Sequence, residues 1–203
     1  MALFLSGQLM SLLGAILPAW RYHIESDFLL IAAYFLCLNL GSILGTAWGR
    51  DFIRRRGLVN VLVLGCGFAA TGLALLGVFS PPAHFAWRLA ACFATGFGAG
   101  LIHTGALHAI VPAYEHEPAS TLSLGGVLFN LGALTTVLVV AGAFFAYTIQ
   151  AVLLVMAFVP AVACVLYARS RLAPGGKTEP SWREALRDFR SPAAILFSLL
   201  LFF

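Results

Sequence analysis

Four polar side chains lie inside long apolar stretches of this sequence, and their types favour neutral hydrogen-bond chemistry. They are Gln8, His103, Thr104 and Asn130. The amide of Gln8 can both donate to and accept from a hydroxyl group, and the imidazole of His103 can exchange a proton in the physiological pH range. Each side chain could instead bond a neighbouring helix. We interpret the four as candidate contacts to a small polar solute, with structural bonds as the alternative.

Other chemistry has little support in the sequence. It contains no G-x-S-x-G or H-E-x-x-H pattern and no glycine-rich phosphate loop outside an expected helix. His108 lies five residues after His103, roughly 140° around a helix, which is a poor arrangement for sharing a metal ion. The cysteines stand singly in apolar segments, as small packing residues do: Cys37, Cys66, Cys92 and Cys164. We therefore predict a protein that is not an enzyme and binds no metal or cofactor.

The composition is that of a membrane protein. Of the 203 residues, 61% are hydrophobic and 10% are charged, and the mean hydropathy is +0.96. Soluble domains are roughly 45–50% apolar and about 25% charged. A transmembrane helix needs about 20 apolar residues, so the length suits six such helices and the start of a seventh. We expect an all-α integral membrane protein embedded in a lipid bilayer.

The apolar stretches predict where the chain crosses the membrane. The expected spans are Ala2 to Trp20, Phe28 to Trp48, Leu58 to Phe79, Trp87 to Pro112, Thr121 to Phe145 and about 150 to 167. Together they form a six-helix bundle over residues 1–170. A linker follows at 171–191, with a short amphipathic helix at 181–190 that begins with a capping box. We interpret the apolar residues 192–203 as a truncated seventh transmembrane helix.

Positive charge falls almost entirely on one side of the predicted membrane. With six spans, one side holds ten cationic residues: Arg50, Arg54, Arg55, Arg56, Arg169, Arg171, Lys177, Arg183, Arg187 and Arg190. The other side holds Arg21 and Arg88. Such an excess marks the cytoplasmic side. We expect a plasma (inner) membrane protein whose N-terminus and 171–191 linker are cytoplasmic, and the net charge of +4 then needs no nucleic-acid partner.

The segment from Gly41 to Gly57 joins a glycine stripe to a group of arginines. Gly41, Gly45 and Gly49 share one helical face, where a second helix can approach closely. We expect the second span to end at Trp48 and the arginines to form a loop. We interpret this segment as a candidate gate, in which Arg50 and Arg54 pair with Asp51 or with a missing second half of the protein.

A weak internal repeat relates the two halves of the bundle. AILPAW at residues 15–20 resembles AIVPAY at 109–114, an offset of 94 residues. The same offset relates the starts of the second and fifth expected spans. Since three is an odd number, two three-helix repeats, about 1–80 and 85–168, must cross the membrane in opposite orientations. A 3+3 inverted repeat that builds a six-helix unit is typical of secondary transporters.

These features together resemble the N-terminal half of a major facilitator superfamily (MFS) transporter. Residues 45–57 are similar to the family's basic loop between helices two and three, although Asp51 is displaced and Phe52 replaces the inner glycine. GFGAG at 96–100 and FNLGAL at 129–134 are similar to fucose-permease-like sugar porters, with Val137 near the place of an expected proline. In such porters, helices one and four line a central cavity, and helix four often carries a proton-accepting acid. His103 lies near that position, which raises proton coupling as a hypothesis.

The resemblance implies secondary active or facilitative transport of a small polar organic solute, for example a sugar, by alternating access. The solute would bind between this unit and a missing C-terminal six-helix half. Two alternatives remain: efflux of amphipathic drug-like compounds, or a non-transporting six-helix membrane partner subunit.

Overall fold

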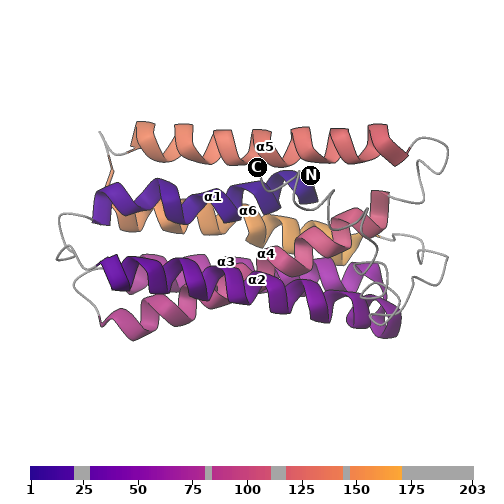
Figure 1. The fold of residues 1–203 in the computed structure, drawn as a ribbon, viewed down its shortest axis with the longest axis horizontal. Coiled ribbons are helices and arrows are strands. Elements are labelled where there is room, and N and C mark those ends of the chain that lie inside the picture. Colours follow the sequence, from indigo (N-terminus) through magenta and orange to yellow (C-terminus); the bar gives the residue numbers. More distant parts are fainter. Residues whose placement is uncertain (21–27, 81–83, 111–117, 144–146, 171–203) are drawn as a thin grey trace, which may run out of the picture.

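The structure is a computed structural model that describes residues 1–20, 28–80, 84–110, 118–143 and 147–170. In this part of the chain it consists of six α-helices: α1 Ala2–Trp20, α2 Phe28–Arg56, α3 Leu58–Val78, α4 Phe85–Ile110, α5 Pro118–Ala143 and α6 Ile149–Arg169. Consecutive helices run in opposite directions, but the closest pairs are mostly not neighbours in sequence: α2 packs on α4, α3 on α4 and α6, and α1 on α5 (Figure 1). The prediction of an all-α bundle with six helices is therefore confirmed. The linker 171–191, its helix 181–190 and the segment 192–203 lie outside the described residues.

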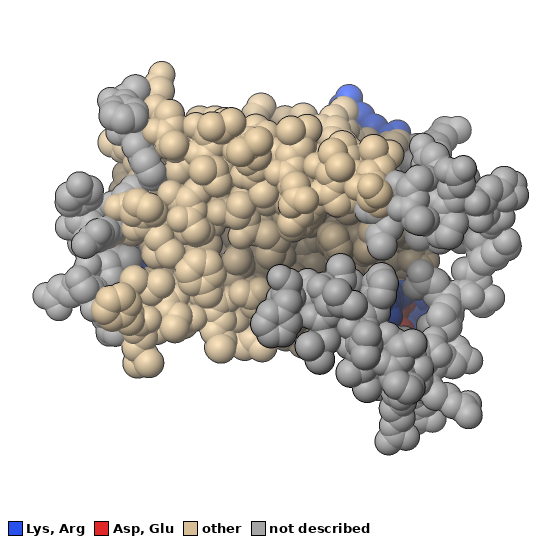
Figure 2. Space-filling model, turned by 45° about the horizontal axis from the view of Figure 1, so that its top comes forward, with Lys and Arg blue, Asp and Glu red and all other residues tan. Residues whose placement is uncertain are grey.

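The lengths and composition of these helices suit a membrane. Five of them are long and apolar enough to cross one, and in α5 the qualifying stretch is Ser123–Ala143. The apolar stretch of α1, Ala2–Pro18, is shorter than these five. In Figure 2 the middle of the visible face carries no charged side chain among the described residues. The chain is thus a multi-pass membrane protein.

The second helix is longer than the sequence predicted. It continues through all four arginines to Arg56, where we expected a helix ending at Trp48 and a loop. Arginine is a good helix former, and cations are favourable near a helix C-terminus. The turn into α3 needs only Gly57, which has φ 85° and ψ 164° and whose N–H donates to the carbonyl of Ile53 at 2.9 Å. The basic segment is therefore a rigid extension of α2.

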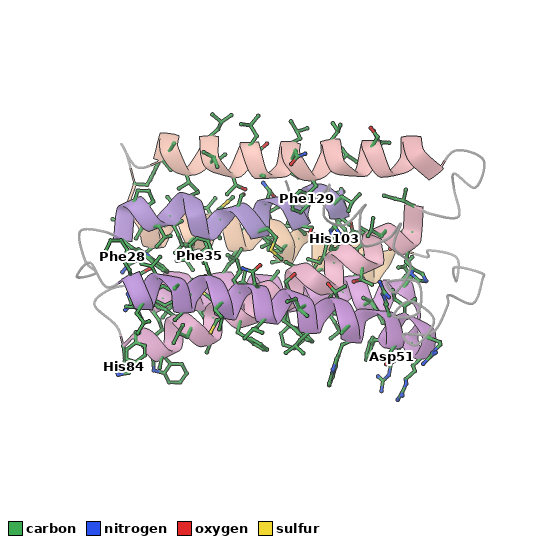
Figure 3. All side chains as sticks on the ribbon, in the orientation of Figure 1. Phe28, Phe35, Asp51, His84, His103 and Phe129 are labelled. Atoms are coloured by element: carbon green, nitrogen blue, oxygen red, sulfur yellow. The ribbon has the colours of Figure 1, made fainter. Side chains whose placement is uncertain are left out.

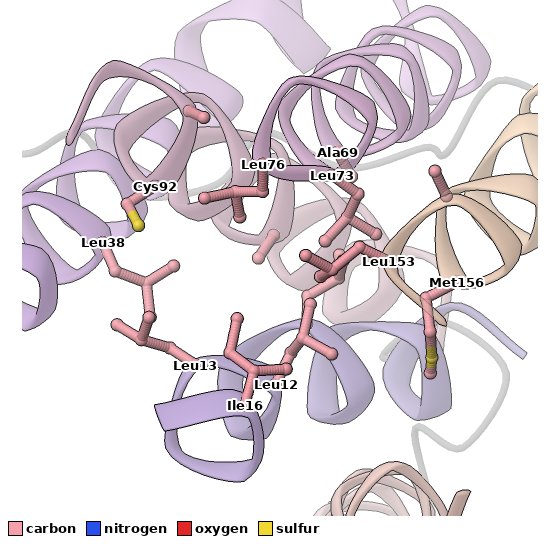
Figure 4. Close-up of a cluster of buried hydrophobic side chains, with 14 of the residues drawn as sticks. Leu12, Leu13, Ile16, Leu38, Ala69, Leu73, Leu76, Cys92, Leu153 and Met156 are labelled. Atoms are coloured by element: carbon pink, nitrogen blue, oxygen red, sulfur yellow. The ribbon is translucent and has the colours of Figure 1, made fainter. Parts of the chain in front are cut away.

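The hydrophobic core lies where α1, α3 and α6 meet. Figure 4 shows Leu12, Leu13 and Ile16 of α1 pointing into a cluster that α2, α3, α4 and α6 complete, with Leu38 of α2 beside Leu13. Leu73 and Leu153, at the centre of this cluster, are at most 1% exposed. The helix α5 is less enclosed, because it packs mainly on α1 and lies along one edge of the bundle (Figure 1). Its outer side chains, such as Leu134 and Leu138, are exposed.

The glycine stripe of α2 packs directly against the backbone of α4. A Cβ added at Gly41 would lie 2.8 Å from the backbone nitrogen of Phe97, and one added at Gly45 would collide with the carbonyl of that residue. In return, a Cβ at Gly96 of α4 would collide with the carbonyl oxygen of Leu38. The predicted close approach at these glycines is therefore confirmed, and the partner is α4.

A second contact of the same kind joins α1 and α5. A Cβ at Gly7 would collide with the carbonyl oxygen of Phe129, and a Cβ at Gly132 would collide with that of Phe4. Each of these two helices thus places a glycine against the backbone of the other, an arrangement that α2 and α4 show at two levels. Glycine at these positions brings the two backbones into direct contact.

Candidate functional site

His103 is the predicted site residue with the most developed surroundings. It lies two turns before the end of α4, and its Nδ1 is 3.3 Å from the hydroxyl oxygen of Ser6 on α1. Its ring meets the edge of the Phe129 ring on α5, with 6.0 Å between the centroids and 82° between the planes. Figure 3 shows the two labelled side chains close together in the interior. Three helices therefore meet at one imidazole, which can donate or accept a hydrogen bond according to its tautomer.

Ser6 was not among the residues singled out in the sequence. It is 1% exposed, and a lone serine in an apolar helix is a weak signal because its hydroxyl can bond its own backbone. Its role depends on the rotation of α1 against α4, which periodicity alone does not define.

Gln8 lies on another side of α1. It is two residues from Ser6, roughly 200° around the helix, and is 8% exposed. It lines a small pocket against α3 and α6, whose other walls are Leu5, Leu9, Leu12, Leu73, Met156 and Pro160. Its backbone carbonyl accepts hydrogen bonds from the hydroxyls of Ser11 and Thr136, each at 3.3 Å. Gln8 and His103 therefore do not share one pocket in this conformation.

Thr104 and Asn130 occupy two further environments. The Thr104 hydroxyl donates to the carbonyl of Gly100 in its own helix at 3.0 Å, and its Cβ would be 3.2 Å from a Cβ added at Gly49 of α2. It thus packs in the contact between α4 and α2. Asn130 is exposed on α5 beside Phe129, on a face that α1 leaves open. The four predicted residues are spread over the six-helix unit, and the structure joins only His103 to a cluster.

The predicted gate residues lie at the end of α2. Asp51 and Arg54 form an ion pair, with 3.0 Å between Oδ1 and Nη2, and their side chains are 56% and 66% exposed. The Arg56 guanidinium carbon is 5.7 Å from the centre of the Phe52 ring. Arg50 is exposed at the same end. Both α2 and α6 finish there, so Arg54, Arg56 and Arg169 belong to one end of the bundle, opposite the end that Phe28 and His84 mark in Figure 3.

Comparison with known families identifies the chain. The sequence profile of the Major Facilitator Superfamily matches residues 1–203. The chain belongs to the major facilitator superfamily. This confirms the resemblance that the residues indicated, and it makes transport of a solute across a membrane the general role of this MFS protein. No curated protein matches its sequence.

Membership also gives the helix arrangement a meaning. Ser6 and His103 lie on α1 and α4, the two helices that the family resemblance predicts to line a central cavity. The similarity to the fucose-permease-like porters remains a prediction.

Proposed function

We propose that this MFS protein carries a small polar organic solute, such as a sugar, across the plasma membrane by alternating access. The observation that carries the proposal is the contact of His103 with Ser6 and Phe129. An imidazole and a hydroxyl provide neutral hydrogen bonds, and the aromatic ring provides an apolar surface, as a sugar-like solute requires. Gln8, Thr104 and Asn130 are proposed as further contacts in conformations that this structure does not represent.

The two glycine contacts support an inverted repeat, which is common among transporters that work by alternating access. Phe4 and Gly7 of α1 face Phe129 and Gly132 of α5, and Phe93 and Gly96 of α4 face Leu38 and Gly41 of α2. In both contacts the residue whose carbonyl is approached precedes the glycine by three. The equivalent residues are 89 apart in α1 and α4 and 91 apart in α2 and α5, close to the offset of 94 found in the sequence. In the proposed mechanism this six-helix unit and a second half rock against each other and expose the site between them to either side in turn.

Proton coupling through His103 is part of the proposal. Histidine is the side chain whose charge changes most readily near neutral pH, and ionisable groups at membrane depth commonly mark ion pathways. A cycle that takes up a proton with the solute on one side and releases both on the other would couple transport to the pH gradient.

The test is uptake into vesicles that contain the full protein, with and without an inward proton gradient, over a panel of radiolabelled sugars. Stimulation by the gradient should be lost in His103→Ala and kept in His84→Gln, a change immediately before the first residue of α4. Gradient-driven uptake that survives His103→Ala would exclude the coupling role. Gln8→Leu provides a second test, because it should raise KM while leaving thermal stability intact. Accumulation of amphipathic dyes, with no sugar transported, would favour the efflux alternative.

A further inference from the structure

A second polar cluster lies at the end of the bundle opposite the α2 arginines. Arg88, in the first turn of α4, is only 6% exposed, and Trp20 at the end of α1 and Tyr34 in α2 are fully buried. The guanidinium carbon of Arg88 is 5.8 Å from the centre of the Trp20 ring and 5.6 Å from that of Tyr34. The two rings meet edge to face with their centroids 5.8 Å apart. We call these three residues the Arg88 cage.

The cage contains hydrogen-bond donors without acceptors. Nε and Nη1 of Arg88, Nε1 of Trp20 and the Tyr34 hydroxyl are buried, and none has a hydrogen-bond partner in the described part of the chain. Guanidinium and indole N–H groups can only donate, and of the three side chains Tyr34 alone can also accept. The carboxylate of Asp51 is not close to Arg88, because it pairs with Arg54 at the other end of α2. The sequence had assigned Arg88 only a topological role.

A buried cation in this state is costly. A charge left buried without a partner is strongly destabilising, and contact with two aromatic rings offsets only part of that cost. The rings also leave the N–H groups without acceptors. An anion that accepts several hydrogen bonds would remove both deficits.

Among anions, a carboxylate fits the cage best. Its two planar oxygens match the planar donors of a guanidinium, and the indole N–H of Trp20 and the hydroxyl of Tyr34 are two further unpartnered donors. The surrounding rings exclude water, which strengthens charge-assisted hydrogen bonds.

We propose that the Arg88 cage is a binding site for the carboxylate of a small organic acid. Fifteen residues of α4 separate Arg88 from His103, which is about 22 Å at 1.5 Å per residue, so the cage is distinct from the cluster around His103. It lies between α1 and α4 at one end of the bundle, where a solute would meet the protein before reaching its middle. The proposal stands independently of the solute carried at His103.

The test uses the full protein purified in detergent, with acetate as the probe. In a variant with Trp48→Phe, Trp87→Phe and Trp182→Phe, the remaining indole is Trp20, whose fluorescence should change saturably with acetate. Wild-type protein should gain several degrees in Tm with acetate at constant ionic strength, since a ligand that binds only the folded state stabilises it. Methyl acetate, which has no charge, should have neither effect.

Arg88→Gln should abolish both responses and, without acetate, should melt no lower than the wild type, because it removes an unpaired buried charge. Arg55→Gln is the matched control at the exposed, opposite end and should respond as the wild type does. If the tryptophan variant does not fold, the Tm shift in otherwise unaltered protein decides.

Three outcomes would overturn the proposal. The first is a folded protein that shows no saturable response to acetate, or the same response in Arg88→Gln. The second is an equal response to chloride, which would indicate a site for simple inorganic anions. The third is a response that emerges only after Glu25→Gln and Asp27→Asn, which would mean that the protein's own carboxylates fill the cage.

Discussion

The hydroxyl oxygen of Ser6 lies 3.3 Å from Nδ1 of His103, across the contact between α1 and α4. We predict that Ser6→Ala weakens solute binding by leaving the imidazole without this partner. One hydrogen bond contributes about 0.5–1.5 kcal/mol, so KM should rise about 2- to 10-fold. Ser11→Ala is the control, because the Ser11 hydroxyl donates to backbone carbonyls of Gln8 and Ala133. Equal values of KM for the two variants would contradict a special role for Ser6.

The close contact of α1 and α5 predicts a large difference between two glycines of α5. Gly132→Ala places a methyl group against the carbonyl of Phe4, whereas a Cβ at Gly126 meets nothing within 4 Å. Overpacking of this kind costs about 1–3 kcal/mol, so Gly132→Ala should lower the Tm in detergent. Gly126→Ala should be neutral or slightly stabilising, because alanine is the better helix former. If both variants melt alike, the backbones do not touch at Gly132.

The Asp51–Arg54 pair allows stability and gating to be separated. The pair is more than half exposed on both sides, and exposed ion pairs contribute roughly 0–1 kcal/mol. Asp51→Asn should therefore leave the Tm nearly unchanged. If the end of α2 acts as a gate, the same variant should slow solute exchange several-fold at unchanged equilibrium binding. Unaltered exchange rates in proteoliposomes would remove Asp51 from the gate.

The distribution of charge predicts the orientation of the protein in the membrane. His84 and Asp51 lie at opposite ends of the bundle (Figure 3), and α2 ends in Arg54, Arg55 and Arg56. Cationic ends stay in the cytoplasm. In a cysteine-free protein in intact cells, an impermeant maleimide should label His84→Cys and should label Arg55→Cys only after the cells are opened. The reverse pattern would place the N-terminus outside.

The positions of most helices could be predicted, because the hydropathy and charge of a short stretch of sequence indicate whether that stretch crosses a membrane. The start and end of α1 agree with the prediction, and the first residues of α2 and α3 do as well. The end of α2 was misjudged, because a run of arginines is compatible with either a loop or a helix. One residue with positive φ, Gly57, decided where the turn lies.

The candidate site was less predictable. The sequence singled out His103 as a polar residue in an apolar helix, but it grouped His103 with Gln8, which lines a different pocket against α3 and α6. It counted Arg88 only as a charge on one side of the membrane, whereas the structure buries it against Trp20 and Tyr34. Burial of a charge near a helix end depends on which neighbouring helices cover it.

The sequence by itself determined that this protein is a helical membrane protein, where most of its helices begin, and at which end its cations gather. These properties depend only on residues that are neighbours in the sequence, so they can be predicted without knowing which distant segments are in contact. Only the tertiary structure decided that Gly41 faces α4, that Ser6 meets His103, and that Arg88 is enclosed by two aromatic rings. Those contacts join segments far apart in the chain, and they depend on the rotation and register of each helix against its neighbours.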